Sequence, residues 1–430
     1  MFRVIIALAF SLVSVSYGYC AQDNPWFDIR KQRISQLLPN AMAVANVDAW
    51  LIVCRENAND PLAKHVGCEN AGQTAAFLFY IKDGAFSSIG FSPMGESTAL
   101  ADMQLLDKVV SVARDASSIE LVSNFIKQQN FERIAINSSD SNKVADGLSH
   151  SQYKAITAAL GEQASAKLVS SDALVYEYMA IKLPAEVEIM RNAAALTAKW
   201  QLEAYAQVVP GKTTDRDVAL FLKQKMAQAG VGDAWAPDQN PNVVSGTDRG
   251  HSHATDRIIQ PGDIIQTDFG IRVHDTWVTD IQRFAYVLKD DEVKPPEDIA
   301  YYWDSAKKGR EAAFAAMKPG ATGRDVDTAQ RDVLIATNSI PVMWSTGHPV
   351  GYVAHDSGPN LGGAYLSPPR PASMLPLKAG MTFAFDGFHS WLLPNGKPKT
   401  ISVEEMVVIT QAGAEYLVPP QQDLVLIQSK

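Results

Sequence analysis

The sequence predicts an α+β protein of two domains, in which the second domain is a duplicated α+β unit. At 430 residues the chain is too long for one ordinary hydrophobic core. Short strand-like segments alternate with helices over residues 45–175, and longer helices begin near residue 184. Beyond that point, one order of helix, Pro-Gly turn and acid-bearing strand occurs twice. These observations favour a small α/β domain followed by a larger domain with internal symmetry.

The first element is a candidate export signal over residues 1–20. Arg3 supplies a short basic region, and Val4–Val15 is an apolar run too short to cross a membrane as a helix. Ser16 and Gly18 are small enough for the −3 and −1 positions of a signal peptidase site, so we expect cleavage after Gly18. The mature protein is then secreted or periplasmic and spans no membrane.

Two alternatives for this leader stay open. Cleavage after Cys20 or Ala21 is also compatible with the sequence. A lipid anchor on Cys20 is disfavoured, because Tyr17 and Tyr19 are bulky where such an anchor needs small or aliphatic residues.

Residues 21–180 form the expected first domain. Its strand-like segments are rich in β-branched and aromatic residues, and its helical segments carry apolar residues at helical spacing. The expected strands are 49–53, 75–81, 86–91 and 133–137, and the expected helices are 118–129 and 143–160. We find no compact set of catalytic residue types here, so the chemistry is expected in the second domain.

Only Cys54 and Cys68 remain after the leader, 14 positions apart in a polar, loop-like stretch. An exported protein meets oxidising conditions, so the pair is predicted to form one disulfide. Two unrelated buried thiols are the alternative, and the spacing does not fit a metal finger.

Residues 181–430 form the expected second domain, which opens with a long helix over 184–207. Pro184 suits the first turn of that helix. The domain then repeats itself with a period near 110 residues, too long for a solenoid. The matching parts are the Pro-Gly turns at 210–211 and 319–320, the helix caps Thr214 and Thr322, and the strands at 262–270 and 380–387. Two halves are expected to close around a shared sheet.

Acidic residues mark corresponding strands of the two halves. Asp268 and Asp386 each lie six positions after a glycine, and the following strands carry Asp280 and the pair Glu404-Glu405. If the halves pack about a pseudo-twofold axis, four carboxylates converge, counting one of the two glutamates. Like charges and burial would raise their pKa values, and two divalent cations would neutralise them.

A glycine-rich loop between the halves carries His348 and His355. One imidazole together with four carboxylates is a ligand set for two metal ions bridged by a hydroxide. Oxygen-rich ligation favours Mn²⁺, with Co²⁺ and Zn²⁺ open.

Several motifs occur in one order along this domain. They are His251 five residues before Asp256-Arg257, Asp268-Phe269-Gly270, Thr279-Asp280-Ile281, Gly347-His348-Pro349-Val350-Gly351, His355-Asp356 and Val403-Glu404-Glu405. Over roughly residues 183–418 the chain resembles the family of aminopeptidase P, prolidase and methionine aminopeptidase, which has the pita-bread fold. The preceding domain resembles the creatinase-type N-terminal domain of aminopeptidase P and prolidase.

The resemblance implies a role for each matching residue. Asp268 would hold one metal ion, His348 and Asp386 the other, and Asp280 and Glu404 would bridge both. His251 and His355 would bind substrate and stabilise the oxyanion, with His253 as a nearby alternative to His251. Asp386 would also handle the proton of the attacking water.

The implied activity is hydrolysis of Xaa-Pro bonds in small peptides by the metal-bridging hydroxide. Relatives are often dimers or tetramers, so the resemblance also allows a homo-oligomer.

Two positions depart from the family pattern. Asp386 replaces a glutamate, so its carboxylate is one methylene shorter, and we expect Gly387 to let the backbone approach the metal. Ser402 replaces an arginine that precedes the last ligand by two residues, and Arg370 is the candidate substitute.

Other functions fit less well. The net charge is −9 without a long basic run, which argues against a nucleic-acid partner. Gly-x-Ser-x-Gly and His-Glu-x-x-His motifs are absent from the sequence, which excludes the usual serine hydrolase and single-zinc sites. The alternatives that remain are a hydrolase of a non-proline amide or ester on the same site, and a catalytically weakened relative that binds a small molecule or peptide.

Overall fold

A computed structural model describes residues 24–57, 59–250 and 252–429. The candidate leader and His251 lie outside these residues. None of the helices in the described part of the chain combines the length and the apolar character that crossing a bilayer requires.

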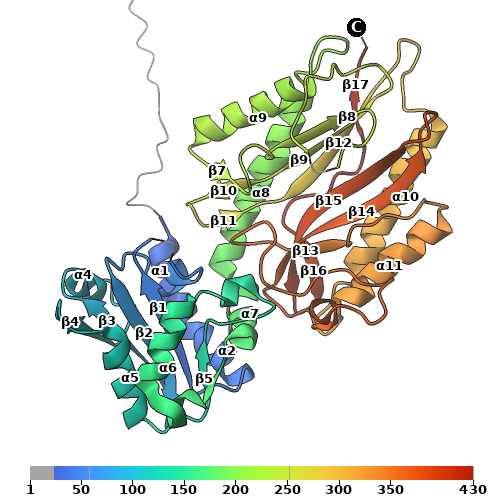
Figure 1. Cartoon of the computed structure of the whole chain (residues 1–430). Helices are drawn as coiled ribbons and strands as arrows, with labels where there is room; N and C mark the ends of the chain where they lie inside the picture. Colours follow the sequence, from blue (N-terminus) through green and yellow to red (C-terminus); the bar gives the residue numbers. More distant parts are fainter. Residues whose placement is uncertain (1–23, 58, 251, 430) are drawn as a thin grey trace, which may run out of the picture.

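The first domain is built on a six-stranded mixed sheet with the order β4-β3-β2-β1-β5-β6 (Figure 1). Its strands are β1 Ala49–Arg55, β2 Thr74–Lys82, β3 Ala85–Pro93, β4 Lys108–Val112, β5 Ile134–Ile136 and β6 Leu168–Ser170. Its helices are α1 Trp26–Gln36, α2 Leu38–Val44, α3 Ala63–Val66, α4 Ser97–Asp102, α5 Ser118–Gln128, α6 His150–Ser165 and α7 Asp172–Ala180, with a 3₁₀ turn at Lys143–Ala145. β1 is buried on both faces, so its apolar residues run without interruption.

The expected helix over 143–160 is wrong in its first part. The structure has a 3₁₀ turn over Lys143–Ala145, and α6 begins only at His150. The Ser149 hydroxyl accepts a hydrogen bond from the Gln152 N–H at 3.2 Å, and the Gln152 side chain accepts one from the Ser149 N–H at 3.0 Å. This capping box starts a new helix and interrupts the apparent periodicity.

Cys54 and Cys68 do not lie in a polar loop. Cys54 is in β1, Cys68 follows α3, and both side chains are buried. The structure joins them in a disulfide with the Cα atoms 6.0 Å apart. The polar residues between the cysteines suggested an exposed loop. The segment is instead drawn into the core, because Leu62 and Val66 pack there.

The second domain contains two similar halves. The first half has α8 Pro184–Tyr205, α9 Asp215–Ala229, β8 Asn242–Ser245, β9 Ile264–Phe269 and β12 Ile281–Val287. The second half has α10 Glu297–Ala316, α11 Gly323–Ala336, β13 Gly347–Pro349, β14 Thr382–Leu392, β15 Pro398–Thr410 and β16 Gly413–Tyr416. Thr214 caps α9 and Thr322 caps α11, each through a capping box with an aspartate three residues later.

The strands of the two halves form two four-stranded sheets, β17-β12-β9-β8 and β13-β14-β15-β16, where β17 is Val425–Ile427. A small sheet of β7 Gly232–Asp233, β10 Ile271–Val273 and β11 Trp277–Val278 lies beside the first. The expected shared sheet is therefore two adjoining sheets, which meet where Arg283 of β12 donates to the Glu404 carbonyl oxygen of β15 at 3.2 Å. Helices α8 to α11 flank the strands (Figure 1).

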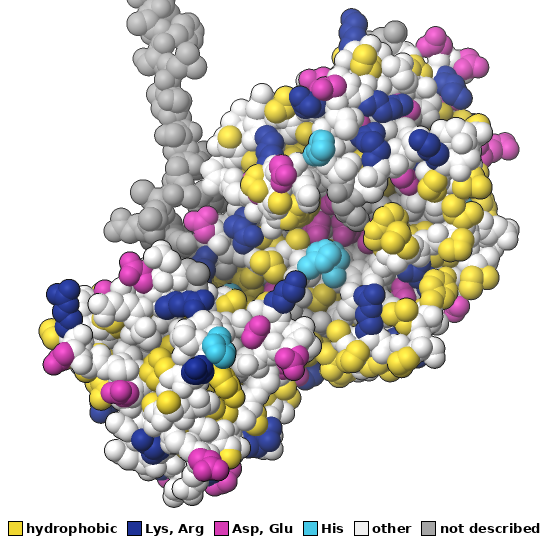
Figure 2. All heavy atoms as spheres, in the orientation of Figure 1, with side chains coloured by type: hydrophobic (Ala, Val, Ile, Leu, Met, Phe, Trp, Pro, Cys, Tyr) yellow, Lys and Arg dark blue, Asp and Glu magenta, His cyan; other side chains and the backbone are white. Residues whose placement is uncertain are grey.

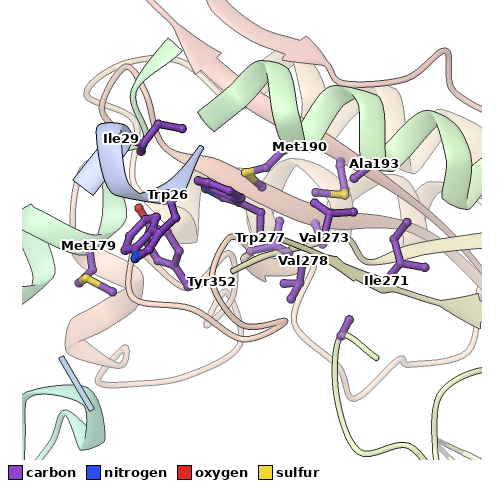
Figure 3. Close-up of a cluster of buried hydrophobic side chains, with 14 of the residues drawn as sticks. Trp26, Ile29, Met179, Met190, Ala193, Ile271, Val273, Trp277, Val278 and Tyr352 are labelled. Atoms are coloured by element: carbon purple, nitrogen blue, oxygen red, sulfur yellow. The ribbon is translucent and has the colours of Figure 1, made fainter. Parts of the chain in front are cut away.

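The two domains share a continuous apolar core. Trp26 of α1 packs edge-on against Trp277 and Tyr352 of the second domain, with ring centroids 5.6 and 6.0 Å away (Figure 3). Met190 of α8 belongs to the same buried cluster. Helix α1 of the first domain therefore packs against β11, α8 and the loop at Tyr352 of the second domain.

Candidate metal centre

Four acidic side chains lie close together at this site, and each comes from a different strand or from the residue directly before a strand. Asp268 is in β9, Asp280 directly precedes β12, Asp386 is in β14 and Glu404 is in β15. Asp386 and Glu404 are direct cross-strand partners, so their side chains leave the sheet on one face. All four are buried, with exposed fractions between 3% and 8%.

His348 of β13 completes the group. Its Nε2 lies 3.7 Å from Asp280 Oδ2 and 3.9 Å from Glu404 Oε1. Ligand atoms of these three residues all lie within 4.8 Å of one another. The His348 Nδ1 is 3.2 Å from the Pro349 carbonyl oxygen. A proton on Nδ1 satisfies that contact and leaves the Nε2 lone pair for a metal ion.

The acids influence one another strongly. Burial raises the pKa of Asp280 well above its usual range, and the charges of Asp268 and Asp386 add to the effect. Burial also raises the pKa of Glu404, with contributions from Asp280 and Asp386, while a hydrogen bond from Gln282 opposes the shift. A bound divalent cation reverses this balance, because it favours the ionised carboxylates.

Asp386 behaves in the same way. Burial and the Asp268 charge raise its pKa well above the usual range, and Arg331 opposes them. Its backbone is fixed by hydrogen bonds, from its N–H to the Thr346 oxygen at 2.8 Å and from Gln330 Nε2 to its own oxygen at 2.9 Å.

The donor set fits a divalent metal ion. Glu404 Oε2 is buried and has no hydrogen-bond partner among the residues that the structure describes, which is costly for a carboxylate unless a cation binds there. Carboxylate oxygens with one imidazole suit Mn²⁺, Co²⁺ or Zn²⁺. Asp268 and Asp386 are linked to the compact group of Asp280, His348 and Glu404 through their charges.

Only one of the two adjacent glutamates faces this site. Glu405 points to the other side of β15, where its carboxylate lies 3.0 Å from Arg283 Nη2 and 3.5 Å from Arg310 Nη1. Since neighbouring residues of a strand face opposite sides, Glu404 is the glutamate that joins the acids.

The site lies at the floor of a cavity of about 710 Å³. Figure 2 shows this face hollowed, with acidic side chains deep in the hollow and a histidine beside them. His355 is exposed on the cavity wall, and its ring stacks on that of His348 with centroids 4.0 Å apart. His253, the alternative to His251, is exposed.

Ser402 belongs to a neutral polar network beside the acids. Its hydroxyl donates to Gln282 Oε1 at 2.7 Å, and Gln266 Nε2 donates to the same oxygen at 2.6 Å. Both glutamines line the cavity, and sequence reasoning missed them. Gln266 stands two residues before Asp268 and Gln282 two after Asp280, so the period of two along a strand was a signal that could have found them. Arg370, the expected substitute for the missing arginine, lines the same cavity.

Gly387 has a different role from the one expected. A Cβ at Gly387 would lie 2.2 Å from the Ala306 oxygen and 2.7 Å from the Arg310 nitrogen. The glycine therefore allows α10 to pack directly on β14, on the side away from Asp386. It does not serve to bring the backbone toward the acids.

Residues 188–411 match the profile of Metallopeptidase family M24. The match spans more than half of the 430 residues, and the chain belongs to this family. The predicted family of metallopeptidases is thereby confirmed.

Among curated proteins the chain is similar to the probable dipeptidase PepE of Mycobacterium bovis, with 25% identity over 241 residues. That alignment covers 54% of this chain and 57% of the relative, so the chain spans little more than half the length of the relative it matches.

Solved structures agree in fold over most of the chain. The X-Pro aminopeptidase from Thermotoga maritima aligns with a TM-score of 0.67 and 21% identity, covering 90% of this chain and all of that one. Dipeptidase PepE from Mycobacterium ulcerans aligns with a TM-score of 0.68 and 21% identity, covering 94% of this chain and 99% of that one. The predicted pita-bread fold is confirmed.

Proposed function

We propose that the protein is an exported metallopeptidase that hydrolyses Xaa-Pro bonds of small peptides at a two-metal centre. The observation that carries the proposal is the group of buried Asp280 and Glu404 with half-buried His348 at the floor of an open cavity, with two more acids close enough to shift the pKa values of the two carboxyl groups. Similar folds include an X-Pro aminopeptidase and the Xaa-Pro dipeptidase from Bacillus anthracis.

The proposed ligand assignment is the one that the family resemblance implies, and the closeness of Asp280, His348 and Glu404 supports it. Asp280 and Glu404, both near His348 Nε2, would be shared between two Mn²⁺ ions. Asp268 would complete the ligand set of one ion, and His348 with Asp386 would complete that of the other. When bound, the two ions lower the pKa of a water molecule and polarise the scissile carbonyl.

The protein's own groups handle orientation and protons. His355, exposed on the cavity wall beside His348, would donate a hydrogen bond to the carbonyl oxygen as negative charge develops there. The Asp386 carboxylate would take a proton from the attacking water and return it to the leaving amine, because the family's glutamate at this position has that role.

The neutral network of Gln266, Gln282 and Ser402 favours a second candidate. A dipeptide ending in proline carries a free carboxylate near the scissile bond, and these three side chains offer it no cation. A longer peptide, or an amide or ester without a free carboxylate there, suits this neutral network better, whereas a free carboxylate would have to reach Arg249, Arg331 or Arg370 elsewhere on the cavity wall. Cleavage of Ala-Pro-Ala in preference to Ala-Pro would favour this substrate class.

The test combines metal analysis with a peptide panel. The purified chain is loaded separately with Mn²⁺, Co²⁺ and Zn²⁺, and we expect about two ions per chain. Ala-Pro and Ala-Pro-Ala are compared with Ala-Ala and Ala-Ala-Ala, and we expect faster cleavage of the proline peptides. Failure to retain any of these ions, or equal rates for matched alanine peptides, would refute the proposal.

A matched pair of variants tests the ligand set. Glu404→Gln is expected to lose metal, whereas Glu405→Gln is expected to keep it, because Glu405 faces Arg283 and Arg310 instead. Equal metal loss in both variants would contradict the assignment.

A further inference from the structure

The loop that joins the two cavity histidines is anchored on its buried side. His348 stands at its start and His355 near its end, where His355 is exposed. Asp356, directly after His355, points the other way, and only 2% of its side chain is exposed. A loop residue that must meet a substrate needs such an anchor, because loops are otherwise the most mobile part of a fold.

Asp356 is anchored through a buried ion pair. Its Oδ2 lies 3.2 Å from Lys182 Nζ, and 1% of the lysine side chain is exposed. The same oxygen accepts the Tyr352 N–H at 2.9 Å, and Oδ1 accepts the Ser357 N–H at 2.8 Å. The Lys182 ammonium also donates to the Met179 oxygen at 2.6 Å. Both ends of the loop segment 352–357 are thereby bonded to one carboxylate.

Gly351 makes room for this pair. A Cβ at Gly351 would lie 2.3 Å from Lys182 Cε and 2.6 Å from Asp356 Oδ2. The second glycine of the Gly-His-x-x-Gly motif is therefore explained by the ion pair that passes beneath it.

Lys182 is itself fixed at the junction of the two domains. Its N–H donates to the Gly380 oxygen at 2.8 Å, and Arg33 of α1 donates to the neighbouring Ile181 oxygen at 2.9 Å. Arg33 also pairs with Glu186 at 2.7 Å, and Glu186 accepts the Tyr352 hydroxyl at 2.6 Å. Figure 3 shows Tyr352 beside Trp26 of α1, so a helix of the first domain supports the histidine loop.

We propose that Lys182 is a positioning residue that, through Asp356, holds His355 in place over the metal centre. This proposal rests on the function proposed above. A buried ion pair alone is weak evidence for stability, since apolar replacements are often neutral. Here the ion pair also fixes the loop, because the Asp356 carboxylate accepts hydrogen bonds from the loop backbone at two points. An apolar pair could not make these bonds.

The test uses a double variant and a matched control. Lys182→Met with Asp356→Asn removes both charges, so no unpaired charge stays buried. Lys378→Met with Glu177→Gln removes another ion pair at the same junction, with Nζ and Oε1 2.5 Å apart and with 35% and 10% of the two side chains exposed. Each protein is loaded with Mn²⁺, and metal content, melting temperature, kcat and KM for Ala-Pro-Ala are measured.

A reading independent of activity is the rate at which diethyl pyrocarbonate modifies His355, followed by peptide mass spectrometry with exposed His150 as internal reference. In the Lys182/Asp356 variant we expect both metal ions to remain, His355 modification to rise about threefold or more, and kcat to fall about tenfold with little change in KM. The control variant should match the wild type in both readings.

The outcomes separate the two proposals. If His355 modification and kcat are unchanged, or change equally in the control, Lys182 does not position His355. If the wild type cleaves no proline peptide, the proposed function fails, while the modification rate still decides the role of Lys182. If the double variant does not fold, Lys182→Leu with Asp356→Asn, which also leaves no unpaired charge buried, gives the same two readings.

Discussion

Asp386 occupies a position where the family pattern has a glutamate, whose side chain is one methylene longer. Hydrogen bonds with Thr346 and Gln330 hold its backbone in place. Asp386→Ala is expected to remove one metal ion and lower kcat by about 10²-fold, because one ligand and one proton acceptor are lost. Asp386→Glu is expected to keep both ions, since the extra methylene reaches toward the other ligands. Metal analysis and kcat/KM measure both effects. Unchanged metal content and turnover in Asp386→Ala would show that Asp386 is not a metal ligand.

His389 offers a test of pH dependence away from the metal ligands. Burial lowers its pKa to about 4, and its ring lies against Tyr302 and 3.3 Å from the Thr337 hydroxyl. The unfolded state then binds a proton at higher pH than the folded state, so stability is present above pH ~6.5 and is lost as pH falls toward ~4.

For this one group we expect the free energy of unfolding to be about 2 kcal/mol lower at pH 5 than at pH 7. Urea unfolding of the wild type and of His389→Gln at the two pH values measures it. In His389→Gln the free energy of unfolding should differ less between pH 5 and pH 7, by about 2 kcal/mol, than in the wild type. An equal pH difference in both proteins would show that His389 does not cause it.

At the scale of elements, the contact between α10 and β14 depends on Gly387. Gly387→Ala places a Cβ 2.2 Å from a backbone oxygen of α10, which cannot move as a side chain can. We expect a loss of about 3 kcal/mol in unfolding free energy, measured by chemical denaturation. Gly95→Ala is the matched control, since a Cβ there meets nothing within 4 Å. Equal stabilities would mean that α10 is not packed as described.

The disulfide joins β1 to the segment after α3, and its two cysteines are 14 positions apart in sequence. In the chain-entropy account a loop of this length contributes about 3 kcal/mol. The double variant Cys54→Ala/Cys68→Ala should unfold at correspondingly lower denaturant. Two free thiols in the mass spectrum of exported material would contradict the pairing.

Local patterns predicted many of these elements, and long-range contacts account for most of the errors. Thr214 and Thr322 were recognisable as caps because a capping box is written within four residues. The break before α6 was missed because apolar spacing continues across it, although Ser149 and Gln152 were a visible signal. The buried course of the chain from Cys54 to Cys68 depends on core contacts that no local pattern records.

For the whole molecule, the metal centre lies between the two halves and should hold them together. Ions that bind the folded state at a hundredfold excess over Kd stabilise it by about 2.7 kcal/mol per site. Removing metal with a chelator is therefore expected to lower the melting temperature, and adding Mn²⁺ to restore it. Calorimetry with and without chelator measures the effect. A chelator-independent melting temperature would argue against metal binding between the halves.

The acids of the site were predictable from the duplication, because their order along the chain matches between the halves. The supports of the site were not. Lys182 and Arg33 come from the junction and from the first domain, and nothing in the spacing of their neighbours indicates that they meet the histidine loop. Such contacts are set by how the domains pack, which a single sequence does not record.

The division of the acids between the halves also bears on how the fold arose. Asp268 and Asp280 come from the first half, and Asp386 and Glu404 from the second. An ancestral half with two acids would have assembled four carboxylates only by pairing with an identical chain, as isologous dimers do. Joining two such copies in one chain would free them from that symmetry, and the halves do differ, since the second half carries Glu404 where the first carries Asp280.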